Sequence, residues 1–335
     1  MNKIQYKGDK TMKKILKNVL IGICILSMTM GCQGDNSTVK KVAVVQYMEH
    51  TSLNTIKDAF DKQMEELGYQ DNQNIEYIFK NAQGDNSIAA SITQTFASEN
   101  PDVVVAIATP VAQSVASLSS TTPVVFAAVS DPIGAKLTSS LEKPDKNITG
   151  TSDEIQVDLI LDKALEINPN LKTLGVIYNK GEANSVTNIQ KAKNYAQKHG
   201  FEIKEATITN VNEVQSAIDV LATQCDAVFA PNDNTIASAM KVVSHSCIQS
   251  QVPLYVGADS MVQDGGFLSV GIDYEELGRE TANMVDQILN GSNVSDIPVK
   301  VFKDDLKIYV NQDVMTQIDV ELPENIIQDS SLVMM

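Results

Sequence analysis

Tryptophan is absent from this sequence of 335 residues, and histidine and cysteine are scarce, with three and four copies. The three histidines lie far apart, and no His/Cys spacing fits a zinc site. A Gly-x-Ser-x-Gly elbow, a P-loop and a Gly-x-Gly-x-x-Gly turn after the first predicted strand are also missing. We therefore predict no cofactor and no metal, and we do not expect an enzyme.

Basic residues are too few to balance the acidic ones. The formal net charge is -16, and residues 1–31 hold six lysines against one aspartate, which leaves 20 basic and 41 acidic side chains in the remainder. A surface this negative repels nucleic acid and anionic headgroups, so neither is a predicted partner. The length suggests about two domains, and 43% hydrophobic with 20% charged residues is ordinary for a soluble globular protein.

Long apolar runs are lacking outside the N-terminus, where "VLIGICILSMTM" follows the charged "KKILK". This run is too short to span a bilayer comfortably and has the layout of a secretory signal. It ends in Gly31 and Cys32, as in a bacterial lipobox, so we predict a lipoprotein signal peptide over residues 1–31 and lipidation of Cys32. The alternative is an ordinary secretory signal with an incidental cysteine. Met12 is an alternative start to Met1.

Two of the four cysteines, Cys24 and Cys32, fall within this N-terminal region. Cys225 and Cys247 remain in the body of the chain and flank one predicted strand-helix unit. They could pair in an oxidising compartment, but their spacing does not require it. We favour two free, mostly buried thiols.

After a short tether, residues 32–39, apolar strands alternate with helical patterns. "KKVAVVQY", "NIEYIFKNAQ", "PDVVVAIAT" and "TPVVFAAVS" are strands of a first series, and "TLGVIYN", "FEIKEATIT", "CDAVFAP" and "VPLYVGA" are strands of a second. Apolar strands separated by helices indicate parallel sheets covered on both faces. The predicted fold class is therefore α/β, with two doubly wound parallel-sheet lobes.

The chain continues past the second series with further strands and a helix, so it must cross between the lobes more than once. We predict a first lobe of residues 40–150 plus about 270–295, and a second lobe of residues 151–269 plus about 296–325. The Pro/Gly/Asn-rich "KPDKNITGTSDE" separates the two series. Two lobes with several crossovers imply a hinge and a cleft.

Polar residues follow several of the strands, at the edge where open α/β sheets bind ligands. These residues could bind a small zwitterion. The backbone N–H groups at the helix starts after Thr109 and at 183–185 would hold its carboxylate, and Asp233 or Asp259 would bind its ammonium group. Phe126 would line the apolar part of the cleft, and Glu49 and His50 follow the first strand. Each residue also has a plain structural reading. Thr109-Pro110 is a standard helix start, Asp233 or Asn234 could cap the next helix, and His50 could be a solvated loop residue.

Several segments resemble the tryptophan/tyrosine class of ABC-transporter substrate-binding lipoproteins. They are "KNAQGDNSIAASI", "VVAIATPVAQSVA", "PVVFAAVSDPIGAKLTSSLEKPDKNITGTSD", "GVIYNKGEANSV", "PNDNTIASA" and "VGIDYEELGRETANM", and the similarity covers about residues 40–312. The resemblance implies a type I periplasmic-binding-protein-like fold that closes on an amino acid.

Carried over by position, the resemblance implies the following ligand contacts: Thr109, Pro110, Asn179, Glu182, Ala183, Asn184, Ser185, Asp233, Asn234 and Asp259. The sequence departs from the family pattern at Gly181, at Asn232 and in the "EHTSLN" loop.

The leading hypothesis is a monomeric, lipid-anchored receptor outside the bacterial cell membrane that delivers an amino acid, preferably an aromatic one, to an ABC permease. The alternatives are a receptor for another small polar solute, such as a sugar or nucleoside, and a ligand sensor domain. Sugar sites usually stack the ring on aromatic side chains, for which a chain without tryptophan is poorly equipped. The signal sequence argues against the sensor.

Overall fold

A computed structural model describes residues 39–304 and 306–335, and the predicted signal peptide, Cys32 and most of the tether lie outside these residues. The first sheet has the order β11-β5-β4-β3-β1-β2. Its strands are β1 (Lys40–Gln46), β2 (Ile75–Asn81), β3 (Val103–Ile107), β4 (Val124–Ala127), β5 (Ile148–Ser152) and β11 (Lys300–Val301). All of its pairs are parallel, and every residue of β3, β4 and β5 is buried.

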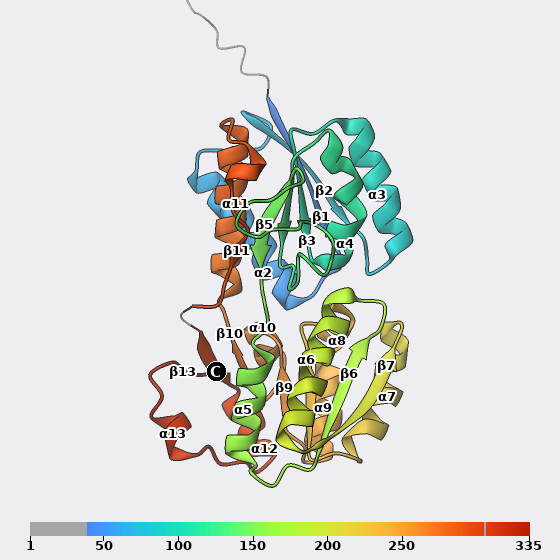
Figure 1. Ribbon diagram of the computed structural model, residues 1–335, viewed down its shortest axis with the longest axis vertical. Coiled ribbons are helices and arrows are strands. Elements are labelled where there is room, and N and C mark those ends of the chain that lie inside the picture. Colours follow the sequence, from blue (N-terminus) through green and yellow to red (C-terminus); the bar gives the residue numbers. More distant parts are fainter. Residues whose placement is uncertain (1–38, 305) are drawn as a thin grey trace, which may run out of the picture. The chain divides into compact units, whose positions relative to one another are not determined.

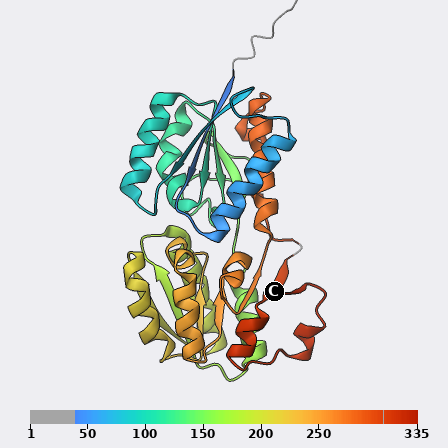
Figure 2. The ribbon, with the colours of Figure 1, turned by 180° about the vertical axis from the view of Figure 1, so that it is seen from behind.

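Helices cover both faces of this sheet and complete what we call the first lobe (Figure 1). They are α2 (Thr51–Glu66), α3 (Asn86–Glu99), α4 (Thr109–Val115), the 3-10 turn η1 (Ala116–Ser120) and α11 (Tyr274–Leu289). Although they are far apart in sequence, α2 and α11 lie side by side (Figure 2). Gly278 allows this approach, because a Cβ there would lie 2.4 Å from the backbone oxygen of Ile56.

The second sheet has the order β13-β12-β10-β9-β8-β6-β7 and forms the second lobe. Its strands are β6 (Thr173–Asn179), β7 (Glu202–Ile208), β8 (Ala227–Ala230), β9 (Leu254–Val256), β10 (Leu268–Gly271), β12 (Lys307–Val310) and β13 (Leu332–Met334). Its helices are α5 (Val157–Ile167), α6 (Ala183–His199), α7 (Val214–Ala222), α8 (Asn234–Ser238), α9 (Met240–Gln249), α10 (Asp259–Gln263), α12 (Gln312–Gln317) and α13 (Glu324–Ile327), and it also contains the 3-10 turn η2 (Val211–Glu213). The remaining 3-10 turn, η3 (Val294–Asp296), lies beside β5 of the first sheet. Among the described pairs only β10 and β12 run antiparallel.

The chain passes between the two sheets after β5, after β10 and after β11. The predicted α/β class with two parallel-sheet lobes and several crossovers is confirmed. Strand β11 hydrogen-bonds to β5 of the first sheet, whereas the sequence assigned residues from about 296 onwards to the second lobe. The division into lobes remains a proposal. We now place the boundary at which the chain returns from the first lobe to the second after Val301, and we extend the second lobe to include β13.

No helix in residues 39–304 or 306–335 is long and apolar enough to cross a membrane.

Candidate functional site

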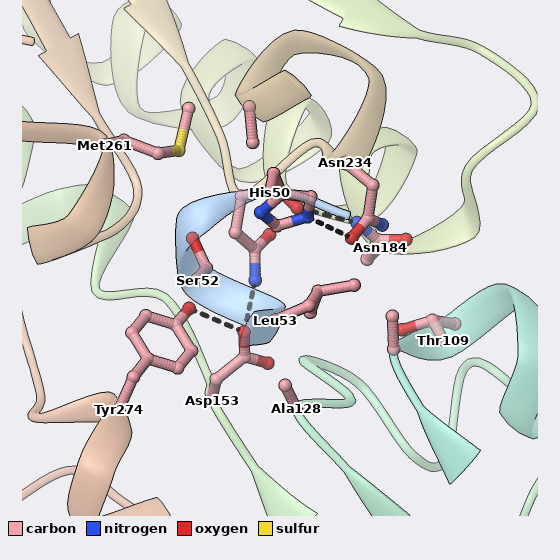
Figure 3. A pocket seen from close by; sticks show the side chains of 13 residues that line it. His50, Ser52, Leu53, Thr109, Ala128, Asp153, Asn184, Asn234, Met261 and Tyr274 are labelled. Carbon is pink, nitrogen blue, oxygen red and sulfur yellow. Dashed lines mark hydrogen bonds between the residues drawn. The ribbon is translucent and has the colours of Figure 1, made fainter. Parts of the chain in front are cut away.

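A cavity lies where loops of the two lobes meet, at the carboxyl ends of the strands. The residues that line it are His50, Ser52, Leu53, Ala108, Thr109, Ala128, Asp153, Asn184, Asn232, Asn234, Ala237, Met261 and Tyr274 (Figure 3). The cavity has a volume of about 20 Å³, which is room for about one water molecule. The walls of the cavity therefore lie close together.

Hydrogen bonds join the lobes around this cavity. His50 Nε2 lies 3.1 Å from Asn234 Oδ1, the hydroxyl oxygens of Ser52 and Ser260 are 2.6 Å apart, and Asn232 Nδ2 donates to Ser130 Oγ over 2.7 Å. All three contacts connect the first lobe to the second. The structure therefore shows the cleft in a closed arrangement.

Asp153 is the carboxylate of the cavity, and it is 5% exposed. It follows β5, on the first crossover, and it accepts hydrogen bonds from Ser130 Oγ (3.0 Å), Asn232 Nδ2 (2.6 Å) and the Tyr274 hydroxyl (2.9 Å). Burial raises the pKa of Asp153 to about 6, although these donors favour the ionised form. No lysine or arginine of the described residues lines the cavity, so an ionised Asp153 has no counter-charge there.

The acceptor capacity of Asp153 is not exhausted by these bonds. A carboxylate offers about four lone-pair sites, two on each oxygen. Within the described part of the chain, Oδ2 receives two donors, from Asn232 and Tyr274, whereas Oδ1 receives one, from Ser130. One acceptor site on Oδ1 can therefore take an N–H group of a ligand.

Three further polar atoms of the lining residues are buried and have no hydrogen-bond partner among the residues that the structure describes: His50 Nδ1, Thr109 Oγ1 and Asn184 Oδ1. Thr109 and Asn184 are only 2% and 4% exposed. Leaving a buried polar group unpaired costs about 1–3 kcal/mol, so such groups are rare unless something else pairs with them. Their gathering around one cavity indicates a site built for a polar ligand.

Two alanines of the lining hold unusual backbone conformations. Ala108, directly after β3, has φ 88° and ψ 153°, and Ala128, directly after β4, has φ 54°. Left-handed angles at non-glycine residues cost of the order of 1–3 kcal/mol and gather at ligand sites. The small side chains leave the cavity open at these turns.

Asp233 and Glu182 form a buried network behind the lining. Asp233 caps α8 by accepting from Ile236 N, and it also accepts from Asn179 N (2.6 Å) and Ser185 Oγ (2.7 Å). Glu182 accepts from the backbone and side chains of Asn234 and Thr235. The two carboxylates thus tie the start of α6 to the start of α8, which holds Asn184 and Asn234 at the cavity.

Stability should depend on pH through this network. Burial, followed by the charge of Asp233, raises the pKa of Glu182 to about 8. A folded-state pKa above the unfolded value means that the folded chain binds the extra proton, so stability falls as the pH rises towards and through 8. We expect the melting temperature to rise by about 2–4 °C when the pH is lowered from 8.5 to 6.5.

Calorimetry on the wild type and on Glu182→Gln checks this expectation, since the variant cannot titrate and should show a flatter profile. The lowered pKa of His50, about 4, acts in the opposite direction but only below about pH 6.5. If the melting temperature changed equally with pH in the wild type and in the variant between pH 6.5 and 8.5, titration of Glu182 would not be the cause of the pH dependence.

The predicted site residues divide into two groups in the structure. His50, Thr109, Asn184 and Asn234 line the cavity. The others do not line it: Glu49, Pro110, Phe126, Asn179, Glu182, Ala183, Ser185, Asp233 and Asp259. Phe126 is fully buried in β4, and Glu49 lies in an outer groove that shares His50 with the cavity.

Both aspartates proposed for an ammonium group lie outside the cavity lining. Asp233 is fully buried within its network, and Asp259, in the first turn of α10, is partly exposed and accepts from Ser260 N. Asp153, Tyr274, Ser52 and Asn232 line the cavity instead and were not among the predicted site residues. Asp153 falls in "TGTSDE", which has the composition of a linker although β5 directly before it is buried.

No group of three or more His, Cys, Asp or Glu side chains suited to a metal ion occurs in the described part of the chain. Cys225 and Cys247 are both free thiols, as the sequence favoured, and burial raises the pKa of the Cys225 thiol to about 11.

Comparison with known proteins identifies the family. Residues 41–334 match the family described as ABC transporter substrate binding protein. The tyrosine-binding protein of Clostridioides difficile is 35% identical over 322 residues, which cover 92% of this chain and 93% of that protein. The crystal structure of an ABC domain in complex with L-Trp from Streptococcus pneumonia is 35% identical, covers 89% of this chain and 100% of that one, and superimposes with a TM-score of 0.84.

A second solved structure informs on the arrangement of the lobes. The ligand-free, open structure of a substrate binding protein with adhesive properties from Clostridium difficile is 38% identical and covers 89% of this chain and 99% of that one, yet its TM-score is 0.66. Coverage and identity are nearly the same as for the L-Trp complex. The difference in TM-score therefore agrees with the closed cleft seen in the interlobe hydrogen bonds.

The match over nearly the whole chain, the two-lobed fold and the ligand cavity together give one assignment. The chain belongs to the ABC transporter substrate-binding protein family, whose members in importers are extracytoplasmic, and it binds a solute rather than catalysing a reaction.

Proposed function

We propose that this protein captures an aromatic amino acid in the interlobe cavity and delivers it to an ABC permease. The observation that carries the proposal is the combination of one buried carboxylate, Asp153, with three unpaired polar atoms and apolar walls in the same closed cavity. A zwitterion with a flat side chain supplies what each of these groups lacks.

The ammonium group pairs with Asp153. The free acceptor site on Oδ1 receives one N–H group, and the unpaired Asn184 Oδ1 is a second acceptor in the same cavity. A positive charge here supplies the counter-charge that the lining does not provide.

The carboxylate is held by neutral donors. Thr109 Oγ1 is an unpaired hydroxyl, and Ser52 and Leu53 stand in the first turn of α2, a helix of 16 residues. The first N–H groups of a helix have no intrahelical partner, and His50, at the N-cap position, makes no side-chain cap. The start of α2 therefore offers donors and a partial positive charge to a carboxylate.

The side chain occupies the apolar part of the cavity, against Leu53, Ala237 and Met261. The C. difficile relative is named a tyrosine-binding protein, and the S. pneumonia structure is a complex with L-Trp. Both names support an aromatic amino acid as the ligand of this chain too.

Thermal shift with the twenty amino acids, nucleosides and common sugars tests the proposal. A ligand that binds only the folded state stabilises it by about 2.7 kcal/mol at 100 times its Kd. We expect tyrosine, tryptophan or phenylalanine to raise the melting temperature most. A response to a sugar or nucleoside, with none from any amino acid, would refute the proposal.

We also propose that the protein acts as a monomer, anchored by lipidated Cys32 outside the cell membrane. This rests on the N-terminal sequence, which the structure does not describe. A single acyl chain binds a membrane only marginally, so two or more chains on Cys32 are expected. In cell fractionation, Cys32→Ser should move the protein from the membrane fraction to the soluble fraction, and Cys225→Ser should not. Retention of Cys32→Ser in the membrane would argue against this anchor.

A further inference from the structure

His50 reaches from one lobe to the other. It precedes α2 in an extended conformation, with φ -161° and ψ 166°, and its ring contacts the second lobe through Nε2 and Asn234 Oδ1, 3.1 Å apart. Figure 3 shows the other ring nitrogen, Nδ1, on the side of the ring away from Asn234. Part of the residue is accessible to solvent, but the Nδ1 atom is buried.

The proton of the ring can be assigned from the hydrogen-bond network. The Asn234 side-chain nitrogen donates to Glu182, so its amide oxygen is the atom that faces His50. An amide oxygen can only accept, and Nε2 must therefore carry the hydrogen. Burial lowers the pKa of His50 to about 4, so the ring is neutral at pH 7 and Nδ1 is a bare acceptor.

No donor of the described residues pairs with this acceptor. The apolar side chains of Leu53, Ala237 and Met261 share the cavity with it. The zwitterionic head of the proposed ligand is already matched to Asp153, Asn184, Thr109 and the start of α2. The Nδ1 atom of His50 therefore remains as an acceptor without a donor, in the part of the cavity that receives the side chain of the ligand.

We propose that His50 Nδ1 makes the site selective for ligands whose side chain carries a hydrogen-bond donor, a phenol or an indole, over ligands that lack one. The inference rests on the proposed function. A ligand without a donor leaves Nδ1 buried and unpaired, so the desolvation of this nitrogen is not compensated. We therefore expect about 10- to 100-fold weaker binding for such a ligand.

Two ligand pairs test the selectivity on the wild-type protein by isothermal titration calorimetry. Tyrosine and phenylalanine differ by the phenol hydroxyl, and tryptophan and benzothienylalanine differ by sulfur in place of the indole N–H. In at least one pair, the member with the donor should bind at least tenfold more tightly. Equal affinity within both pairs would overturn the inference but leave the proposed function intact. Binding of phenylalanine without tyrosine or tryptophan would also overturn the inference, whereas binding of no aromatic amino acid would refute the proposed function itself.

His50→Leu removes the acceptor and should bring the affinity ratio within each pair close to one. The matched control is His245→Gln, an exposed histidine on α9, which should keep the wild-type ratio. A ratio that persists in His50→Leu would overturn the inference. Should His50→Leu fail to fold, ¹⁵N NMR of the wild type decides, since the chain has only three histidines. The Nδ1 resonance of His50 should shift with tyrosine or tryptophan and not with the analogue that lacks the donor, and an equal response to both would overturn the inference.

Discussion

Replacing Asp153 by asparagine should weaken amino-acid binding by about 100-fold, the largest loss expected for a substitution of one atom in the cavity. A charge pair that is buried and hydrogen-bonded loses about 2–5 kcal/mol when one charge is removed, and each 1.4 kcal/mol is a factor of ten. Asparagine keeps the size of the side chain and can still accept from Tyr274 or Ser130. The loss should therefore appear in the affinity measured by calorimetry more than in the fold.

The control for this experiment is Asp259→Asn. Asp259 was the sequence-based candidate for the same role, and its burial likewise raises its pKa to about 6, but it does not line the cavity. We expect its affinity to stay within a few-fold of the wild type. The opposite pattern, a large loss in Asp259→Asn and none in Asp153→Asn, would disprove the assignment of the ammonium group.

The pH dependence of binding gives an independent check on Asp153. With its pKa raised to about 6, the side chain loses its charge as the pH falls through 6, and the ammonium group then has no partner. Affinity should decline below about pH 6 in the wild type. In Asp153→Asn it should be low and much less dependent on pH.

Replacing Asp233 by alanine should have its main effect on stability, with a loss of roughly 3 kcal/mol or more. The carboxylate is fully buried, and its removal leaves the N–H groups of Asn179 and Ile236 and the Ser185 hydroxyl without their acceptor, at about 1–3 kcal/mol each. Relief of the repulsion with Glu182 offsets part of this cost. Urea denaturation measures the change.

Asp85→Ala is the matched control for Asp233→Ala. Asp85 also caps a helix, α3, by accepting from Ser87 N and Ile88 N, but it is exposed, and among the described residues its side chain has no partner outside the start of α3. Loss of such a cap costs about 0.5–2 kcal/mol. If the two variants lose similar stability, the cross-link between α6 and α8 is weaker than its geometry implies.

The fold was largely predictable because most of the strands carry their own sequence signal. Runs such as "VVVAI" and "AVFA" are apolar throughout, as buried parallel strands require, and the helices between them have clear periodicity. Three strands were not expected from the sequence: the short β11 and β13, and β5, "ITGTS", whose composition resembles a loop. In β5, Thr149 and Thr151 are buried because they bond to Ile297 O and to the Thr281 hydroxyl, partners about 130–150 residues away that no local pattern reveals.

The sequence pointed to the edge of the sheets where the cavity lies, but to only some of the residues that line it. Of the polar residues that follow strands, His50, Thr109, Asn184 and Asn234 line the cavity. Whether an aspartate faces the cavity or turns back to cap a helix depends on side-chain direction. Asp233 and Asp153 both follow strands and differ only in which groups surround them.

The turns at Ala108 and Ala128 limit what evolution or engineering can do with this pocket. Both positions require a left-handed backbone, which disfavours most side chains, and both face a narrow space, which disfavours large ones. Saturation libraries selected for ligand binding should return almost only alanine and glycine at these two positions. Changes in ligand preference would then have to come from the α2 and α10 side of the cavity, where the backbone is helical and does not restrict the residue type in this way.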